Sequence, residues 1–115
     1  MTQPDRIQLL QGTLDLLVLR TLVFGPLHGH GIMTAIRQMS EDVLLIDNGS
    51  LYPSLQRLEL KGLIAAQWEI SERNRRARVY RLTAAGRKAL RTEISRWGDF
   101  VRAVGLVLDP APAKE

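Results

Sequence analysis

Cysteine is absent from the 115 residues of this chain. Its absence excludes disulfide bonds and thiolate metal sites and leaves a cytoplasmic location as the default. The two histidines, His28 and His30, have neither a cluster of acids nor a third ligand at a recognisable spacing beside them. We therefore expect no metal site and no cofactor.

The sequence also lacks a membrane-spanning segment and a secretory signal. The apolar stretch over residues 14–24 is interrupted by Asp15 and Arg20 and is too short to cross a bilayer. Residues 1–12 lack the basic start and long apolar run of a signal peptide. These absences predict a cytoplasmic protein with no membrane partner.

Catalytic motifs are lacking as well. The sequence has no nucleophile elbow, no phosphate-binding glycine loop and no paired carboxylates at a meaningful spacing. We expect that the protein is not an enzyme.

The sequence does have the composition of a small globular domain, and its charge is uneven. Hydrophobic residues make up 45% and charged residues 24% of the chain. Residues 1–70 hold five Lys or Arg against seven Asp or Glu, residues 71–96 nine against two, and residues 97–115 two against three. The net charge of +4 therefore comes from one segment, which indicates a polyanionic partner.

Three helices are expected in the first half of the chain. Residues 13–24 form an apolar helix that Gly25 and Pro26 stop. A second helix ends near Asp42, and its buried face is predicted at i, i+3, i+4 and i+7: Ile32, Ala35, Ile36 and Met39.

The third helix carries Leu51, Leu55 and Leu58 on one face and ends at Gly62. Pro53 has no N–H and must lie near the helix start, so we predict Ser50 as the N-cap and Pro53 as the third helical position. An N-cap at Asp47 or Asn48 would require a distorted first turn. With the leucines inward, the exposed face and its flanks are predicted to carry Ser50, Tyr52, Pro53, Ser54, Gln56, Arg57 and Leu60.

A β-hairpin and a fourth helix follow. Residues 64–70 and 77–82 alternate with a period of two, and the polar turn SERNRR between them includes Asn74, which tolerates positive φ. Thr83 is the predicted N-cap of the last helix, whose apolar residues recur at spacings of 4 and 3, typical of a coiled-coil seam: Leu90, Ile94, Trp97, Val101, Val104 and Leu108.

The order helix, helix, helix, hairpin, helix predicts a mainly α fold with a small β-hairpin. It is that of a winged helix-turn-helix, with three helices and a two-stranded wing, followed by a C-terminal dimerisation helix. We expect the winged domain over residues 9–82, the dimerisation helix over 83–109 and a disordered tail over 110–115.

In this arrangement the third helix enters the major groove of DNA and the hairpin lies beside it. Gln56 suits an adenine edge, Arg57 suits a guanine edge, and the hydroxyls of the same helix suit phosphates. The hairpin supplies further DNA-binding residues: Arg73, Arg75, Arg76 and Arg78.

Four stretches resemble the PadR-type transcriptional regulators: LLQGTLDLLVLRTL, HGHGI, NGSLYPSLQRLELKGLI and RRARVYRLTAAGR, together most of residues 9–87. The resemblance implies a dimeric winged-helix repressor that responds to a small aromatic or apolar compound. It also implies that a short C-terminal region dimerises through a single last helix.

We therefore expect a cytoplasmic homodimer that binds a double-stranded DNA operator and represses transcription until an effector releases it. Trp97 is either a residue that fills space between the paired helices or a platform for a planar effector. Two other functions remain open: a winged-helix module that binds an acidic protein, and an RNA-binding protein.

Overall fold

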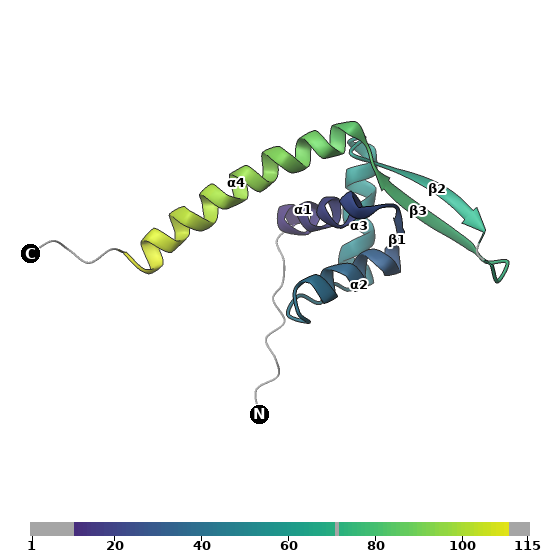
Figure 1. Cartoon of the computed structure of the whole chain (residues 1–115), viewed down its shortest axis with the longest axis horizontal. Helices are drawn as coiled ribbons and strands as arrows, with labels where there is room; N and C mark the ends of the chain where they lie inside the picture. Colours follow the sequence, from purple (N-terminus) through teal and green to yellow (C-terminus); the bar gives the residue numbers. More distant parts are fainter. Residues whose placement is uncertain (1–10, 71, 111–115) are drawn as a thin grey trace, which may run out of the picture.

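The computed structural model of the chain describes residues 11–70 and 72–110. Three helices form the centre of the molecule, a sheet extends from one side and a long helix leaves from the other (Figure 1). In chain order the elements are α1 (Gln11–Thr21), the 3-10 turn η1 (Leu22–Phe24), β1 (Leu27–His28), α2 (Gly29–Met39), α3 (Asn48–Leu60), β2 (Ile64–Ile70), β3 (Arg76–Leu82) and α4 (Ala84–Leu108). This is the mainly α winged-helix arrangement expected from the sequence.

The core lies where α1, α2 and α3 meet the base of the sheet. Leucines and isoleucines at helical spacing point inward from each helix and exclude water together, and this burial is the main stabilising term. The buried residues are Leu14, Val18, Leu19, Leu22, Ile32, Ile36, Leu51, Leu55, Leu58, Ile64, Tyr80 and Leu90. The predicted inward faces of α2 and α3 are thus confirmed, except that Ala35 is only half-buried and Met39 is 55% exposed.

The sheet has three strands, whereas the sequence predicted two. Leu27 and His28 pair with Tyr80 and Val79, so β1 adds a short edge strand to the hairpin in the order β1-β3-β2. Two extended residues carry too little of an alternating pattern to be recognised in a sequence. The added strand ties the wing to the start of α2.

The hairpin forms where the sequence predicted it, with β3 beginning one residue earlier than expected, at Arg76. Ile64 pairs with Leu82 and Ile70 with Arg76, and Asn74 has a φ of +57°. Only the base of the hairpin lies on the core, because Trp68 is 54% and Ile70 71% exposed. The outer half of the wing therefore projects into solvent.

The start of α3 differs from the prediction. Asp47, rather than Ser50, is the N-cap, and its carboxylate accepts the N–H of Ser50 at 2.8 Å. Pro53 consequently lies inside the helix as its sixth residue, where the carbonyl of Gly49 receives no N–H from it. The first turn is tightened, since the carbonyl of Asp47 accepts from both Ser50 and Leu51. The Asp47 carboxylate thereby satisfies one of the free N–H groups at the start of the helix.

Two glycines control how α3 and α4 end and begin. Gly62 follows α3 with a φ of +72°, and the N–H groups of Gly62 and Leu63 bond the carbonyls of Glu59 and Leu58, which closes a Schellman motif. Gly86 lies in the first turn of α4 against the carbonyl oxygen of Leu63, where a Cβ would overlap that oxygen. Thr83 caps α4 as predicted, because its hydroxyl accepts the N–H of Gly86 at 3.0 Å.

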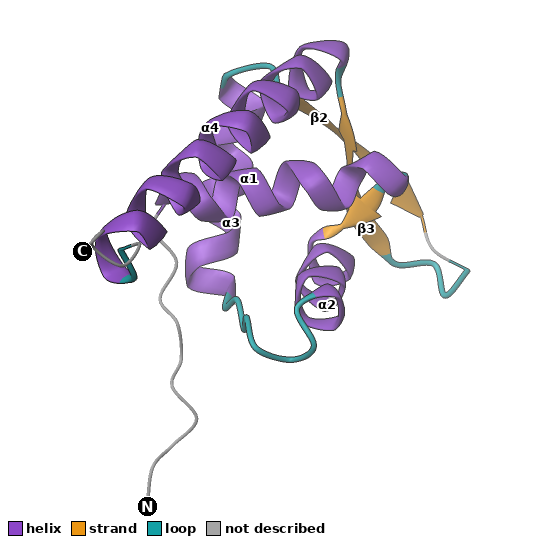
Figure 2. Cartoon of the chain, turned by 60° about the vertical axis from the view of Figure 1, so that its left-hand side comes forward, coloured by secondary structure: helices purple, strands orange, loops and turns teal. Residues whose placement is uncertain are grey.

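Most of α4 lies beyond the core. Its first half crosses α1, and the rest extends away from the other helices (Figures 1 and 2). Leu90, predicted at a dimer interface, is instead 5% exposed within its own chain because the start of α4 packs on the core. The remaining seam residues are exposed to between 36% and 78%: Ile94, Trp97, Val101, Val104 and Leu108. Of the predicted tail, residues 111–115 lie outside the described part.

Candidate nucleic-acid interface

The exposed face of α3 is one half of the candidate site. Tyr52, Pro53, Gln56 and Leu60 are open to solvent on this face, with Ser50 at its start. Leu51, Leu55 and Leu58 hold the opposite face in the core. The spacing of apolar residues thus determines which side chains α3 offers to a partner.

Ser54 does not lie on the exposed flank, contrary to the sequence-based expectation. Its side chain is fully buried and its hydroxyl donates to Asp15 Oδ1 on α1 at 2.5 Å. On a helical wheel Ser54 lies about 40° beyond Leu58, at the edge of the buried face that packs on α1. Ser54 therefore cannot hold a phosphate.

Arg57 lies at the edge of the exposed face and is paired within the chain. Its Nη2 donates to Asp15 Oδ1 at 2.9 Å and its Nε to Oδ2 at 3.4 Å. The side chains of Arg57 and Asp15 are 28% and 14% exposed. The sequence showed Asp15 only as an interruption of an apolar helix, although a lone carboxylate there needs a partner.

Tyr52 links α3 to the start of α2. A Cβ on Gly29 would lie 2.8 Å from the Tyr52 hydroxyl, so the absence of a side chain at Gly29 lets the two helices approach here.

His28 caps α2, because its Nδ1 accepts the N–H of Gly31 at 3.0 Å. Its ring stacks with that of His30, and the two ring centres are 6.3 Å apart. Neither histidine belongs to a group of three or more metal-binding side chains within the described residues.

The wing is the other half of the site. Arg73, Arg75, Arg76 and Arg78 are all exposed on it, as predicted. Trp68 faces Arg78 across the strands, and the guanidinium groups of Arg76 and Arg78 lie 4.7 and 5.8 Å from the centre of its ring. Trp68 was expected only to pack, but here it carries two arginines on its face by cation–π contact.

Glu59 connects the wing to the end of α3. Its Oε2 accepts from Arg78 Nη2 at 2.7 Å, and both side chains are more than a third exposed. An exposed pair of this kind adds little stability. The contact joins Arg78 of the wing to the C-terminal end of α3.

Tyr80 lies beneath this junction. Burial raises the pKa of the Tyr80 phenol above its ordinary value, with a smaller opposite effect from the positive charge of Arg78. The neutral phenol is therefore the form that the fold accommodates.

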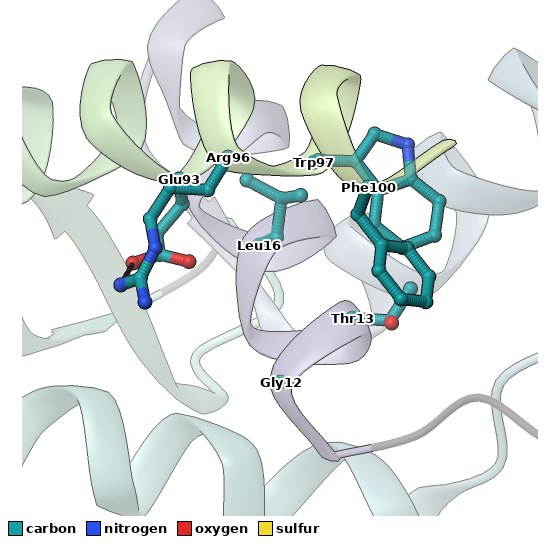
Figure 3. Close-up of a pocket in the computed structure, with 7 residues that line it drawn as sticks. All are labelled: Gly12, Thr13, Leu16, Glu93, Arg96, Trp97 and Phe100. Atoms are coloured by element: carbon teal, nitrogen blue, oxygen red, sulfur yellow. Dashed lines mark hydrogen bonds and ion pairs between the residues drawn. The ribbon is translucent and has the colours of Figure 1, made fainter. Parts of the chain in front are cut away.

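A separate groove lies between α1 and α4, away from the wing (Figure 3). It has a volume of about 430 Å³ and is lined by Gly12, Thr13, Leu16, Glu93, Arg96, Trp97 and Phe100. The rings of Trp97 and Phe100 lie 5.8 Å apart and are tilted by 35°. Phe100 was not singled out from the sequence, although its place three residues after Trp97 puts both rings on one side of the helix.

No helix in the described part of the chain combines the length and the apolar character that a membrane span requires.

Known proteins resemble this chain in sequence and in structure. The model of the transcriptional regulator PadR-like family matches residues 18–92. An uncharacterised protein of a Streptomyces fradiae transposon is 45% identical over 101 residues, which cover 88% of this chain but only 27% of that protein. The chain thus spans about a quarter of that relative.

Two solved structures share the fold. A PadR family transcriptional regulator from Eggerthella lenta is 30% identical, with a TM-score of 0.75 over 88% of this chain and 86% of that one. A transcriptional regulator from Clostridium thermocellum is 26% identical, with a TM-score of 0.76 over 83% of this chain and 92% of that one.

Proposed function

This chain belongs to the transcriptional regulator PadR-like family, and we propose that it is a homodimeric repressor that binds double-stranded DNA and is released by a small apolar or aromatic effector. As a member of this family it is a regulator of transcription and not an enzyme.

One observation carries the proposal: the exposed face of α3 and the arginine-bearing wing follow each other in one domain, where the Glu59–Arg78 ion pair joins the C-terminal end of α3 to β3. An α-helix fits the major groove, which is about 12 Å wide, and arginines beside it meet phosphates or a narrow minor groove. Gln56 and Arg57 are then the residues that contact base edges. Contacts to the backbone come from Ser50, Tyr52, Pro53, Arg73, Arg75, Arg76 and Arg78.

The dimer is supported by the apolar surface of α4. The exposed seam residues are joined by Phe100, Leu106 and Val107, which are between 57% and 79% exposed. A helix that leaves so much apolar surface in water is expected to pair with a second copy. Two-fold symmetry would then bring two α3 helices to half-sites about 34 Å apart, which is one turn of DNA.

The effector is proposed to bind in the groove between α1 and α4. A volume of about 430 Å³ suits a drug-sized molecule, and the two tilted rings offer an aromatic face. Binding would favour one spacing of the two winged domains over the other and so change the affinity for the operator.

Binding to the DNA upstream of the protein's own gene tests the proposal. Fluorescence anisotropy is measured with this fragment and with random duplex of equal length at several salt concentrations. We expect the fragment to bind at least about a thousandfold more tightly, and the logarithm of the association constant to fall linearly with that of salt. Equal affinity for random duplex or for structured RNA would contradict the proposal.

A further inference from the structure

Asp15 is an unusual residue at its position in the fold. Its neighbours Leu14, Val18, Leu19 and Leu22 are all buried in the core, yet Asp15 is a carboxylate whose side chain is only 14% exposed. It lies on α1, outside the surface proposed to meet DNA, and its two partners both belong to α3.

The contacts use both oxygens of the carboxylate. Oδ1 accepts from Ser54 Oγ and from Arg57 Nη2, and Oδ2 accepts from Arg57 Nε. The carboxylate of Asp15 therefore bonds the guanidinium along one edge, which fixes the plane of the guanidinium as well as its position. Its Nη1 takes part in none of these bonds, and the side chain keeps 28% of its surface exposed.

We propose that Asp15 is a positioning residue for DNA recognition, which holds the guanidinium of Arg57 so that its remaining N–H groups face a base edge beside α3. The proposal rests on the proposed function, in which α3 enters the major groove. Two physical effects support it.

The first effect is preorganisation. A free arginine side chain has many rotamers, and ordering it on DNA costs entropy that weakens binding. Asp15 orders the side chain of Arg57 before DNA arrives, while the buried donor Ser54 keeps the carboxylate itself in place. The planar guanidinium then meets a guanine edge in the geometry that a bidentate contact needs.

The second effect is the cancellation of charge. The Asp15–Arg57 pair is neutral as a unit, so Arg57 attracts phosphates far less than the wing arginines do. The residue can therefore contribute to sequence preference without adding equally to the affinity for every duplex. A merely structural ion pair would have no such effect on sequence preference.

The test measures sequence preference rather than affinity alone. A duplex selected by the wild-type protein from a random pool is compared with random duplex and with a panel of single base-pair substitutions, for Asp15→Asn, Arg57→Gln and the double variant. Asp109→Asn, the same chemical change at an exposed position at the end of α4, is the matched control. Thermal unfolding reports whether each variant is folded.

We expect Asp15→Asn to lower the preference for the selected duplex about tenfold, which is within the discrimination of one bidentate contact. The loss should fall at the base pair where Arg57→Gln also relaxes preference, and the double variant should be no worse than Arg57→Gln. Affinity for random duplex should not fall and should rise by a few-fold, since the phosphate contacts of the wing are intact and the charge of Arg57 is no longer neutralised. Asp109→Asn should leave the preference unchanged.

Three results would overturn the proposal. The first is full preference in Asp15→Asn where Arg57→Gln loses it, and the second is full preference in both variants. The third is an equal weakening of all duplexes by Asp15→Asn, as a purely structural role requires. If the wild type itself fails to prefer any duplex, the proposed function fails instead. If Asp15→Asn does not fold, Ser54→Ala replaces it. A loss of sequence preference at the same base pair then supports the proposal. No loss of preference, or an equal weakening of all duplexes, contradicts it.

Discussion

At Gly86 the backbone of α4 comes close to the loop that leads into β2. The carbonyl oxygen of Leu63 occupies the space of a Cβ, and the same oxygen accepts the N–H of Thr83. This contact joins the end of α3, the start of β2 and the start of α4. Because Gly86 has a hydrogen atom in place of a side chain, α4 can leave the domain in its observed direction.

Replacing Gly86 with alanine should destabilise the protein. The new methyl group meets backbone that cannot yield, so we expect a loss of about 3 kcal/mol in the free energy of unfolding, as in an overpacked core. Urea denaturation measures it. Gly105→Ala is the control in the same helix, where nothing lies within 4 Å, and it should gain up to about 1 kcal/mol. Equal effects at the two sites would contradict the close approach.

Tyr80 gives the stability of the protein a dependence on alkaline pH. Burial raises the pKa of its phenol, so the folded state resists the ionisation that the unfolded state allows. The stabilisation is complete below the unfolded pKa of about 10 and is lost as pH rises through the higher folded value. Tyr80→Phe should therefore lose less stability than the wild type in urea denaturation between about pH 9 and 11. Equal losses of stability in the wild type and in Tyr80→Phe over this pH range would show that Tyr80 does not cause the alkaline pH dependence.

Among the elements, the wing carries most of the positive charge that is proposed to meet the DNA backbone. Arg76 and Arg78 lie over the ring of Trp68, and Arg78 also pairs with Glu59. The sequence alone revealed the hairpin, its turn and its charge. It did not reveal that Trp68 supports the arginines, because the contact depends on the register that places Trp68 opposite Arg78.

Arg76→Ala should weaken binding to all duplexes alike. Loss of one phosphate contact lowers the slope of the logarithm of affinity against the logarithm of salt by about 0.9. Anisotropy titrations at several salt concentrations measure the slope. Arg102→Ala, which removes an exposed arginine from α4, should leave it unchanged. A change confined to one DNA sequence would instead indicate that Arg76 contacts a base.

The helices α1 and α4 form the groove proposed for the effector. The fluorescent probe anilinonaphthalene sulfonate, an aromatic compound, should bind there and gain fluorescence. Trp97→Ala should weaken its binding about tenfold, since an aromatic contact and its buried area are lost together. Trp68→Ala, on the distant wing, is the control and should not weaken it. Unchanged binding in Trp97→Ala would exclude the groove as the probe's site.

At the scale of the whole molecule, α4 extends from the domain with its apolar residues in solvent. The 4-3 spacing predicted a seam, and the structure leaves five of its six residues exposed. Leu90 belongs instead to the core of the same chain. Any interface with a second copy therefore begins one turn later along α4 than the sequence indicated.

A charge placed in the seam should separate the proposed dimer. Val101→Asp puts a carboxylate among apolar side chains and should give a monomer in sedimentation equilibrium, with weaker binding to a two-half-site duplex. Thr92→Asp introduces the same group on the opposite side of α4 and should remain dimeric. A wild-type monomer at working concentrations would contradict the dimer itself.

The sequence by itself determined the helices, the hairpin, the caps at Thr83 and Gly62 and the clustering of arginines. These features depend on neighbours within a few residues, where spacing and backbone chemistry are decisive. Where two local signals competed, as Asp47 and Ser50 did for the N-cap of α3, the sequence favoured the wrong residue.

Only the tertiary structure decided the roles of Asp15, Ser54 and Arg57. Their contacts join residues about forty positions apart, and no local pattern encodes which face of α1 meets which face of α3. The same holds for β1, which pairs across 50 residues with β3. Packing of the core sets these distances, and the core forms only when all three helices are in place.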